Sequence, residues 1–455
     1  MLFRKKQKDI INWINNGTNA LLVTGARQVG KTFLIRECLN SESVDYLEIN
    51  LIKEPKYIST FESAIEKDLE TLLQTFSVIA NRPLIKGKTV IFIDEVQECK
   101  EIVTAIKFLV EDGRYRYILS GSLLGVELVD LRSAPVGYLS TITMYPLDLE
   151  EFLIANDLNE KFIVDLKNCF INKIPVNNVL HDKLIEAFYR YLIVGGMPKA
   201  VSIYIETNDL MSVSNVHLDI KNEYLKDFTK YENDKSKKLK LIKTYELIPS
   251  ELNEQNKRYI FKHLDDNLKF DRYENSFNWL IDAGVAIPVY NSTEPMIPLE
   301  VNKKSSLFKF FLSDVGMLTT SFGRNTILKL LSKDQNINYG AVFENFVAQE
   351  LNSHNIKSYY YVSKKYGELD FVIEYFGEVL PIEVKSGKNY TQHSALNNIL
   401  SIDNYNIKNA FVFSNSNITV NDKITYYPIY MIMFLNNDII ELPKLNDLNL
   451  KDIKI

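Results

Sequence analysis

A glycine-containing loop near the N-terminus constrains the fold of this chain more than any other feature of its sequence. The loop reads Gly25-Ala26-Arg27-Gln28-Val29-Gly30-Lys31-Thr32, and it lies between an apolar run at residues 20–23 and the apolar residues 33–35. A strand, a G-x-x-x-x-G-K-T loop and a helix in this order are typical of a phosphate-binding loop, in which backbone N–H groups surround phosphate oxygens at a helix N-terminus. The alternative is a glycine turn that only joins a strand to a helix.

The loop predicts a site for ATP and Mg²⁺. We expect Lys31 to reach the β- and γ-phosphates and the Thr32 hydroxyl to be a ligand of Mg²⁺. The rest of the loop is expected to hold phosphate oxygens through Gly25, Ala26, Arg27, Gln28, Val29 and Gly30.

Two later apolar runs end in polar residues that would lie beside this loop. Residues 90–93 are followed by Asp94 and Glu95, and residues 117–119 are followed by Ser120. We expect Asp94 to hold Mg²⁺ through water, Glu95 to act as the catalytic carboxylate that polarises the attacking water, and Ser120 to sense the γ-phosphate. Glu95 could instead be a solvated residue at a strand end, and Ser120 an ordinary turn residue. The acid pair predicts hydrolysis of ATP as well as binding.

An arginine commonly balances the charge of the transferred phosphoryl group in such sites. Arg114, Arg116 and Arg132 are candidates by position in the chain, but their spacing selects none of them. The sequence therefore leaves this role unassigned.

Two alternating segments in the C-terminal region place charged residues on one face of a sheet. Residues 368–373 put Asp370 opposite three apolar positions, and residues 380–385 put Glu383 and Lys385 together on one face. The two segments predict a charged hairpin.

A turn centred on Phe376-Gly377 would set Asp370 directly across from Glu383. Facing carboxylates repel unless a cation lies between them, which predicts Mg²⁺ or Mn²⁺ at Asp370 and Glu383, with Lys385 beside the reacting phosphate or water. Glu344, on the inward face of an expected helix, is the predicted further metal ligand. These groups would cleave a phosphodiester, with Asp370, Glu383 and Lys385 as catalytic residues. The alternative is a solvated hairpin with ordinary charges.

Composition limits the partners and the location of the protein. A net charge of -5 over 455 residues argues against a surface coated with nucleic-acid-binding charge, although one local basic run could neutralise phosphates or simply be the solvated side of a helix. The three cysteines have no metal-ligand spacing and no apolar run approaches the length of a membrane span, so we expect a soluble protein of the cytoplasm with no membrane partner. The basic run comprises Lys235, Lys237, Lys238, Lys240 and Lys243.

The chain length predicts several domains of the α/β class. Residues 1–150 are expected to form a parallel sheet flanked by helices, and residues 151–234 a helical lid or linker that breaks at Gly195-Gly196-Met197-Pro198. Residues 235–325 predict a winged-helix-like domain, with helices on both sides of a Pro249-Ser250 break followed by strands. Residues 326–455 begin with a helix and then become rich in strands.

Together these motifs resemble a family of bacterial and archaeal AAA-type P-loop ATPases with a winged helix and a C-terminal domain of unknown function similar to restriction endonucleases. The resemblance implies a PD-(D/E)XK nuclease-like fold for residues 326–455, with Asp370, Glu383 and Lys385 as metal and catalytic positions and Glu344 as the helix acid. Many members carry a Gly-Arg pair where this chain has Gly137-Tyr138, so no arginine is implied there. The resemblance is carried by residues 25–32, 92–97, 119–122, 145–147 and 195–198, and by Asp370 with Glu383-Val384-Lys385.

The leading hypothesis is an ATP-driven switch coupled to a metal-dependent nuclease-like domain that acts on DNA or RNA. The alternative is an ATPase whose C-terminal domain is catalytically silent and only binds nucleic acid or a protein partner. A homo-oligomer, in which a neighbouring subunit supplies the arginine, stays open at this point.

Overall fold

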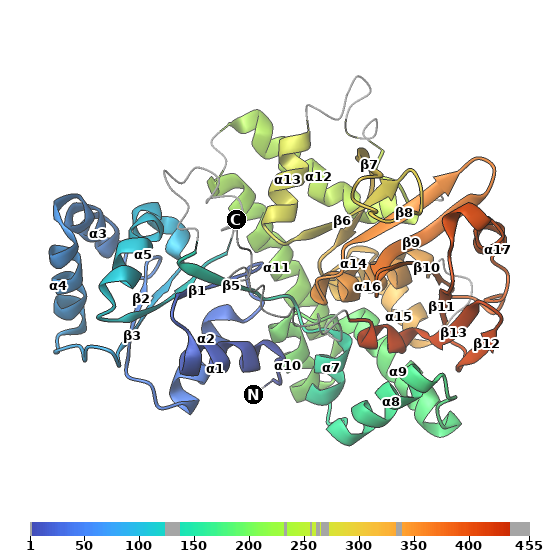
Figure 1. The fold of residues 1–455 in the computed structure, drawn as a ribbon, viewed down its shortest axis with the longest axis horizontal. Helices are drawn as coiled ribbons and strands as arrows, with labels where there is room; N and C mark the ends of the chain where they lie inside the picture. The colour runs from blue at the N-terminus through green and yellow to red at the C-terminus, as the bar shows by residue number, and fades with distance from the viewer. Residues whose placement is uncertain are drawn as a thin grey trace, which may run out of the picture.

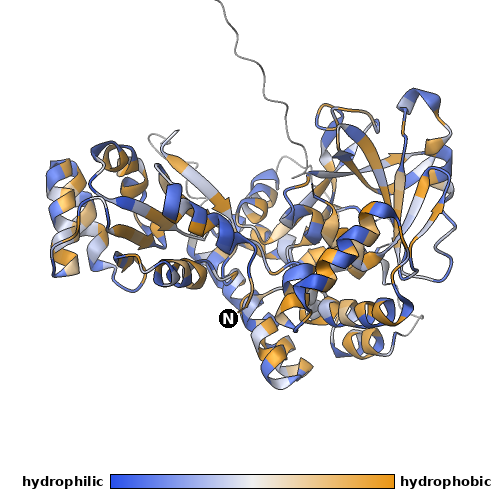
Figure 2. Ribbon diagram, turned by 60° about the horizontal axis from the view of Figure 1, so that its bottom comes forward, coloured by the Kyte–Doolittle hydropathy of each residue, from blue (hydrophilic) through white to orange (hydrophobic). Residues whose placement is uncertain are grey.

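The computed structural model describes residues 2–122, 137–231, 234–254, 257–260, 264, 273–333 and 339–436. Figure 1 shows a small sheet with its helices at one end of the molecule, a larger sheet at the other end, and the long helix α11 between them. Hydrophobic residues follow the strands of both sheets, whereas the surrounding helices are hydrophobic on one side (Figure 2). None of the helices in the described ranges is both long and apolar enough to cross a membrane.

The N-terminal sheet is parallel and has the strand order β2-β3-β4-β1-β5. Parallel strands end at the same edge, so the residues that follow β1, β3 and β4 meet there. All five residues of β3 are buried, as expected for a strand covered on both faces. The elements are α1 (Lys6–Asn16), β1 (Ala20–Thr24), α2 (Lys31–Ser41), β2 (Tyr46–Asn50), α3 (Lys56–Lys67), α4 (Leu69–Ala80), β3 (Val90–Asp94), η1 (Val96–Glu98), α5 (Lys100–Asp112), β4 (Arg116–Ser120) and β5 (Leu139–Thr143).

A helical region follows the sheet. The expected break at the paired glycines is present, because α9 ends at Val194 and α10 begins at Pro198. The expected break at Pro249-Ser250 is wrong: α12 continues through Pro249, held by buried residues such as Tyr245, Ile248 and Leu252 on its inner face. The elements are α7 (Leu149–Ala155), α8 (Glu160–Asn172), α9 (Asn178–Val194), α10 (Pro198–Thr207), α11 (Leu210–Tyr231) and α12 (Lys235–Asn253).

The second sheet is mixed and, in the described part of the chain, has the order β12-β13-β11-β10-β9-β8-β6-β7. The hairpin β6–β7, which the sequence assigns to a winged helix, pairs through β6 with β8 and so lies in the same sheet as the C-terminal strands. The elements are α13 (Glu274–Asp282), β6 (Ala286–Ser292), β7 (Lys303–Leu312), α14 (Val315–Ser321), α15 (Arg324–Leu331), α16 (Gly340–Ser353), β8 (Ser358–Ser363), β9 (Gly367–Tyr375), β10 (Glu378–Val384), α17 (Ser394–Leu400), η5 (Asp403–Tyr405), β11 (Ala410–Ser414), β12 (Thr419–Asn421), β13 (Ile424–Pro428) and η6 (Ile429–Phe434).

The paired glycines form a tightly packed junction between the two halves of the molecule. The Gly196 carbonyl accepts a hydrogen bond from Leu147 N at 2.7 Å, and the Gly196 N–H donates to Asp314 Oδ2 at 2.6 Å. A Cβ atom at Gly196 would lie 2.0 Å from the Leu147 carbonyl oxygen, so the junction requires glycine. Nearby, the His217 side chain is buried against the Val194 carbonyl, with Nε2 at 3.0 Å from that oxygen.

Candidate functional site

The glycine loop joins β1 to α2 at the carboxyl edge of the N-terminal sheet. Gly25 has φ +134°, and a Cβ atom there would lie 2.1 Å from the Met144 carbonyl oxygen, so this position also requires glycine. The Lys31 side chain is buried, and its Nζ donates to the carbonyls of Gly25 and Ala26 at 2.9 and 2.8 Å. Burial lowers the pKa of Lys31 to about 8, although Glu95 and Asp94 oppose this shift. A buried ammonium that points back over its own loop is suited to take phosphate oxygens as partners.

Asp94 receives hydroxyl and amide donors from three neighbouring elements. The Thr32 hydroxyl lies 3.1 and 3.0 Å from the two Asp94 carboxylate oxygens, Asn50 Nδ2 donates at 2.8 Å, and the Ser120 hydroxyl also donates to Asp94. Burial raises the pKa of Asp94. The paired Thr32 hydroxyl and Asp94 carboxylate are the oxygen ligands that suit Mg²⁺. No sequence pattern points to Asn50, which ends β2 directly beside Asp94 in the sheet register.

Glu95 follows Asp94 in the left-handed conformation, with φ 58°. Its Oε2 atom accepts from Gln97 Nε2 at 2.7 Å and lies 3.4 Å from the Ser122 hydroxyl. These contacts hold the carboxylate at the edge of the sheet where the loop also lies. Neither Gln97 nor Ser122 was assigned a role from the sequence, although both lie within motifs that carry the family resemblance.

Helix α11 contacts the glycine loop directly. Arg27 forms an ion pair with Asp227 at 2.8 Å, and the Tyr224 hydroxyl donates to the Arg27 carbonyl at 3.1 Å. Gln28 bonds to Glu223 on the same helix. Two successive loop residues are thus connected to a helix from the following region.

Arg114 and Arg116, two of the three arginines that the sequence offers, do not lie at this edge. Arg116 begins β4, about 13 Å along the strand from Ser120. Arg114 binds Glu70 at 2.6 Å and Asp112 at 2.8 Å near that same strand start. Arg132 lies outside the described residues.

A cavity of about 420 Å³ opens beside the start of α2. Its walls come from the N-terminal segment, from Phe33 and Leu34 on α2, and from Pro198 and Ile205 on α10. The mostly apolar lining and the contact with Gly30 give this cavity the properties of a site for a flat base next to a phosphate loop.

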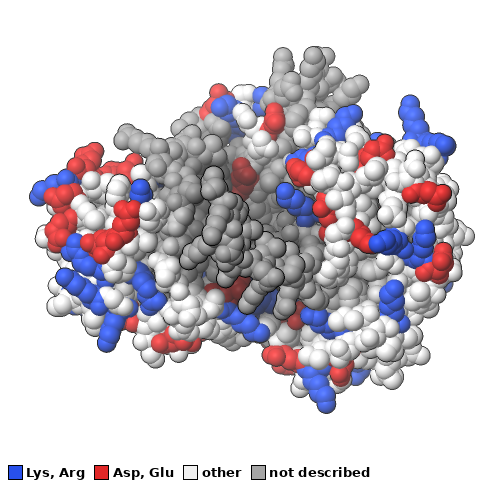
Figure 3. Space-filling view, in the orientation of Figure 1, with Lys and Arg blue, Asp and Glu red and all other residues white. Residues whose placement is uncertain are grey.

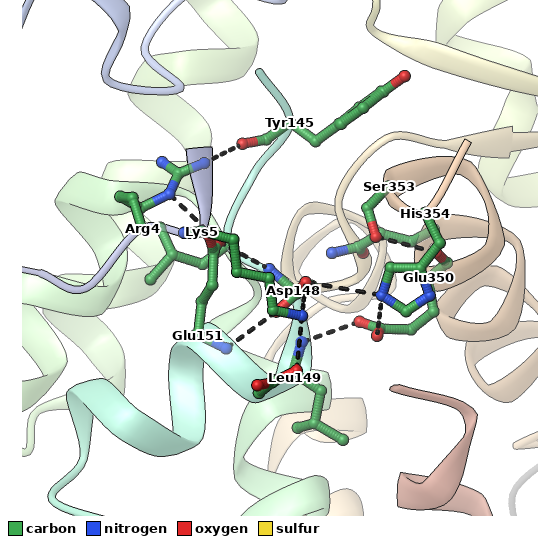
Figure 4. Close-up of polar contacts among 12 residues, drawn as sticks. Arg4, Lys5, Tyr145, Asp148, Leu149, Glu151, Glu350, Ser353 and His354 are labelled. Atoms are coloured by element: carbon green, nitrogen blue, oxygen red, sulfur yellow. Dashed lines mark hydrogen bonds and ion pairs between the residues drawn. The ribbon is translucent and has the colours of Figure 1, made fainter. Parts of the chain in front are cut away.

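A buried arginine connects the loop to the polypeptide after the sheet. Arg4 donates from its two terminal nitrogens to the carbonyls of Val29, at 2.8 Å, and Tyr145, at 2.6 Å, and its Nε lies 3.2 Å from Glu151 (Figure 4). Burial, together with the charge of Asp148, raises the pKa of Glu151 to about 7. The position of the loop therefore depends on the first residues of the chain.

The same polar network reaches helix α16 of the C-terminal half. Lys5 pairs with Asp148 at 2.6 Å, His354 Nε2 lies 3.7 Å from Asp148, and Leu149 N donates to Glu350 at 2.9 Å (Figure 4). Burial opposes the ionisation of Asp148, but Lys5 and His354 hold its pKa well below the usual range. The network joins the N-terminal segment, α7 and α16.

In the C-terminal sheet, β9 and β10 form the hairpin expected from the sequence. The strands turn at Phe376-Gly377, and their register runs to the pair Ile382 and Phe371, which sets Glu383 next to Asp370. Asp370 Oδ2 accepts from the backbone N–H of residue 384 at 2.9 Å. Lys385 Nζ lies 3.0 Å from Glu383.

Two lysine side chains neutralise Glu344, the residue that the sequence predicts to be a metal ligand. Lys309 on β7 lies 3.3 Å from Glu344 and 2.9 Å from Glu368, and Lys257 also pairs with Glu344. Within the described residues, no three or more His, Cys, Asp or Glu side chains form a group that could hold a metal ion. Lys309 and Lys257 could not be foreseen, because the strand and segment that carry them lie far from α16 in the sequence.

Burial controls the protonation of the acids in this cluster. Burial raises the pKa of Glu383 to about 8, with a further contribution from the charge of Asp370. Burial, with the charge of Glu344 beside it, also raises the pKa of Asp370. Burial also disfavours the charge of Lys309, but Glu344, Asp370 and Glu368 outweigh it and raise the pKa of that lysine. Lys309 is therefore a charged and paired ammonium in the interior.

Comparisons with known proteins divide the chain into three matched parts. Residues 17–153 match a family described as an AAA domain, whereas residues 185–327 and 339–432 match families described only as domains of unknown function, DUF8612 and DUF4143. No curated protein matches the chain.

Two solved structures show low similarity to this chain. A Walker-type ATPase of Pyrococcus abyssi is 14% identical, with a TM-score of 0.44 over 71% of this chain and 96% of that chain. A structure titled "Structural Basis for Katanin Self-Assembly" is 15% identical, with a TM-score of 0.24 over 34% of this chain and 55% of that chain. The AAA-domain match, together with the glycine loop and the strand order around it, assigns residues 17–153 to an AAA-type P-loop domain.

Proposed function

We propose that this protein binds ATP with Mg²⁺ at residues 25–32 and hydrolyses it. The observation that carries the proposal is the contact of the Thr32 hydroxyl with the Asp94 carboxylate, 3.0 Å apart, beside the buried ammonium of Lys31. Lys31 would exchange its carbonyl partners for phosphate oxygens, while Thr32 and Asp94 hold the metal, Asp94 through water. Mg²⁺ would neutralise charge on the phosphates. Glu95 would orient the attacking water, and Ser120 would report the γ-phosphate through Asp94.

The cavity beside α2 is the proposed site of the adenine base. Phe33 and Leu34 directly follow the phosphate loop, so a nucleotide whose phosphates lie on the loop extends toward them. Pro198 and Ile205 of α10 would cover the other side of the base. Closure of this helical region over the nucleotide would then depend on the glycine junction that precedes α10.

The test is a comparison of three variants in nucleotide binding and hydrolysis. Lys31→Ala is expected to abolish binding, because the cradle loses its ammonium. Glu95→Gln is expected to retain binding but to lower the turnover rate at least about 100-fold, the effect of losing a general base. Lys67→Ala, an exposed lysine at the end of α3, is the control and should match the parent. Hydrolysis by Lys31→Ala at the parent rate would refute the proposal.

A second candidate function is metal-dependent cleavage of DNA or RNA at Asp370, Glu383 and Lys385. The observation that favours it is the close placement of these three side chains on one hairpin. Lys257 and Lys309 argue for the silent alternative, a C-terminal domain that only binds nucleic acid or a protein partner, because they already neutralise Glu344.

Charge on the visible surface does not decide between these candidates, since basic and acidic residues are interspersed over the described part of the face in Figure 3. A titration with Mg²⁺ and Mn²⁺, followed by a cleavage assay with and without ATP, separates them. Cleavage by the parent that is lost in Lys385→Ala would support the nuclease. Cleavage that is absent from the parent, with no metal bound, would leave the silent domain.

A further inference from the structure

Arg27, the third residue of the glycine loop, brings a second cation close to the proposed catalytic carboxylate Glu95. Arg27 Nε donates to the Ser122 hydroxyl at 3.2 Å, and this hydroxyl lies 3.4 Å from Glu95 Oε2. The guanidinium is therefore two hydrogen bonds from the carboxylate proposed to orient the attacking water. Its charge also acts on Lys31, because it contributes to the lowering of the Lys31 pKa. Arg27 therefore lies near Glu95 and Lys31, two of the groups proposed to act on the γ-phosphate.

The chain holds Arg27 through its backbone and its side chain separately. The Tyr224 hydroxyl donates to the Arg27 carbonyl, which fixes the loop, while Asp227, one helical turn later on α11, pairs with the guanidinium at 2.8 Å. Asp227 is buried, and burial raises its pKa to about 6 in spite of Arg27. A carboxylate in this position is a partner that the guanidinium can leave when a more strongly charged anion arrives, since a phosphate group offers a guanidinium more charge and a two-pronged contact.

We propose that Arg27 is the catalytic arginine of this ATPase, supplied by the same chain, and that Asp227 holds it until the γ-phosphate replaces the carboxylate. The inference rests on the proposed ATP hydrolysis. In that reaction a bond forms between the water oxygen and the γ-phosphorus while the bond from that phosphorus to the bridging oxygen breaks. ADP and inorganic phosphate are formed, and the water proton passes toward Glu95. Arg27 exchanges no proton and stabilises charge on the γ-phosphoryl oxygens.

The exchange also gives α11 a part in the nucleotide response. When Arg27 leaves Asp227, the helix loses its ion pair with the loop but keeps the hydrogen bond from Tyr224. The presence of a γ-phosphate would therefore remove the ion pair with Asp227 but keep the contacts of Tyr224 and Glu223 with the loop. These residues lie on a helix that packs on α10, α12 and α14.

The experiment measures hydrolysis and nucleotide affinity in Arg27→Ala, Arg27→Lys and Asp227→Asn, with Arg82→Ala, an exposed arginine, as the control. Arg27→Ala should lower the turnover rate about 100- to 1,000-fold, the effect of removing one donor to a developing oxyanion. It should also weaken binding of a non-hydrolysable ATP analogue while ADP affinity stays near that of the parent. Asp227→Asn should raise the turnover rate above that of the parent, because the guanidinium no longer has to leave a carboxylate.

Three results would overturn the inference. Turnover by Arg27→Ala within threefold of the parent would exclude a catalytic arginine, and equal weakening of ADP and ATP-analogue binding would exclude a contact specific to the γ-phosphate. Equal losses in Arg27→Ala and Asp227→Asn would show that the ion pair is only a structural clamp. Retained ADP binding by Arg27→Ala reports a folded loop. If the parent itself hydrolyses no ATP, the proposed function fails first, which distinguishes the two failures.

Discussion

Replacement of the buried Lys309 by methionine should destabilise the C-terminal sheet more than any surface substitution. Lys309 is 1% exposed, and its ammonium lies 3.3 Å from Glu344 and 2.9 Å from Glu368. Methionine keeps the length and most of the volume of the side chain, so the change removes the charge with little change in packing. Glu344 would then remain buried with one cation fewer.

The size of the effect follows from the balance of charges in the cluster. Removing one partner of a buried ion pair costs about 3–5 kcal/mol, because the remaining charge has no solvent and no counterion. Glu344 retains Lys257, so the lower part of this range is expected. The urea dependence is about 1–3 kcal/mol per molar for small proteins and increases with chain length, so at about 3 kcal/mol per molar a loss of about 3 kcal/mol lowers the unfolding midpoint by about 1 M.

Urea unfolding followed by far-ultraviolet circular dichroism measures this shift, and Lys303→Met is the matched control. Lys303 lies on the same strand, but its partner Glu300, at 3.2 Å, is about half exposed, so the pair contributes only about 0–1 kcal/mol. Equal midpoints for Lys309→Met and Lys303→Met would refute the assignment of Lys309 as the internal counterion of the acids. We expect added Mg²⁺ to recover part of the loss in Lys309→Met and to leave the parent unchanged, because the freed carboxylates can then accept a cation.

Two further predictions concern the junction between the halves. Burial lowers the pKa of His217, so its neutral form is favoured on folding, and the stability it contributes above its ordinary pKa of about 6.5 is lost as the pH falls. The difference in melting temperature between the parent and His217→Gln should therefore shrink from about pH 8 to about pH 5, and a difference independent of pH would contradict this account. Gly196→Ala should cost at least about 1–3 kcal/mol by calorimetry, because its Cβ would lie 2.0 Å from a carbonyl oxygen of Leu147, whereas Gly387→Ala, where nothing lies within 4 Å, is the control.

The parts of the fold that the sequence predicts are those whose determinants are local. The glycine loop, the buried strand that ends in Asp94 and the turn at Phe376-Gly377 each depend on a few consecutive residues, and all three elements are present. The helix break predicted at Pro249 is wrong, because packing of the helix outweighs one missing N–H group.

The contacts that the sequence could not predict join distant segments. The pairing of Lys309 with Glu344 joins residues 35 positions apart in the sequence. The ion pair of Arg27 with Asp227 joins the glycine loop of the N-terminal sheet to helix α11 of the helical region. The sequence pattern does not identify these partners. From the pattern, a lysine on an alternating strand is expected to face solvent, and only the position of the neighbouring helix shows that it is buried. Parallel pairing of β6 with β8 is likewise invisible in the sequence, because α14, α15 and α16 intervene between the two strands.

The hairpin β6–β7 has a consequence for any attempt to isolate the C-terminal part of this protein. A fragment that begins at residue 326 would lose both strands, leaving one edge of β8 with unpaired backbone N–H and C=O groups. It would also leave Glu344 without the ammonium of Lys309. We expect such a fragment to aggregate, whereas one that starts ahead of α13 retains the sheet edge and the internal counterion. In evolutionary terms, the hairpin would have to be inherited with the C-terminal strands whenever they are transferred to another protein.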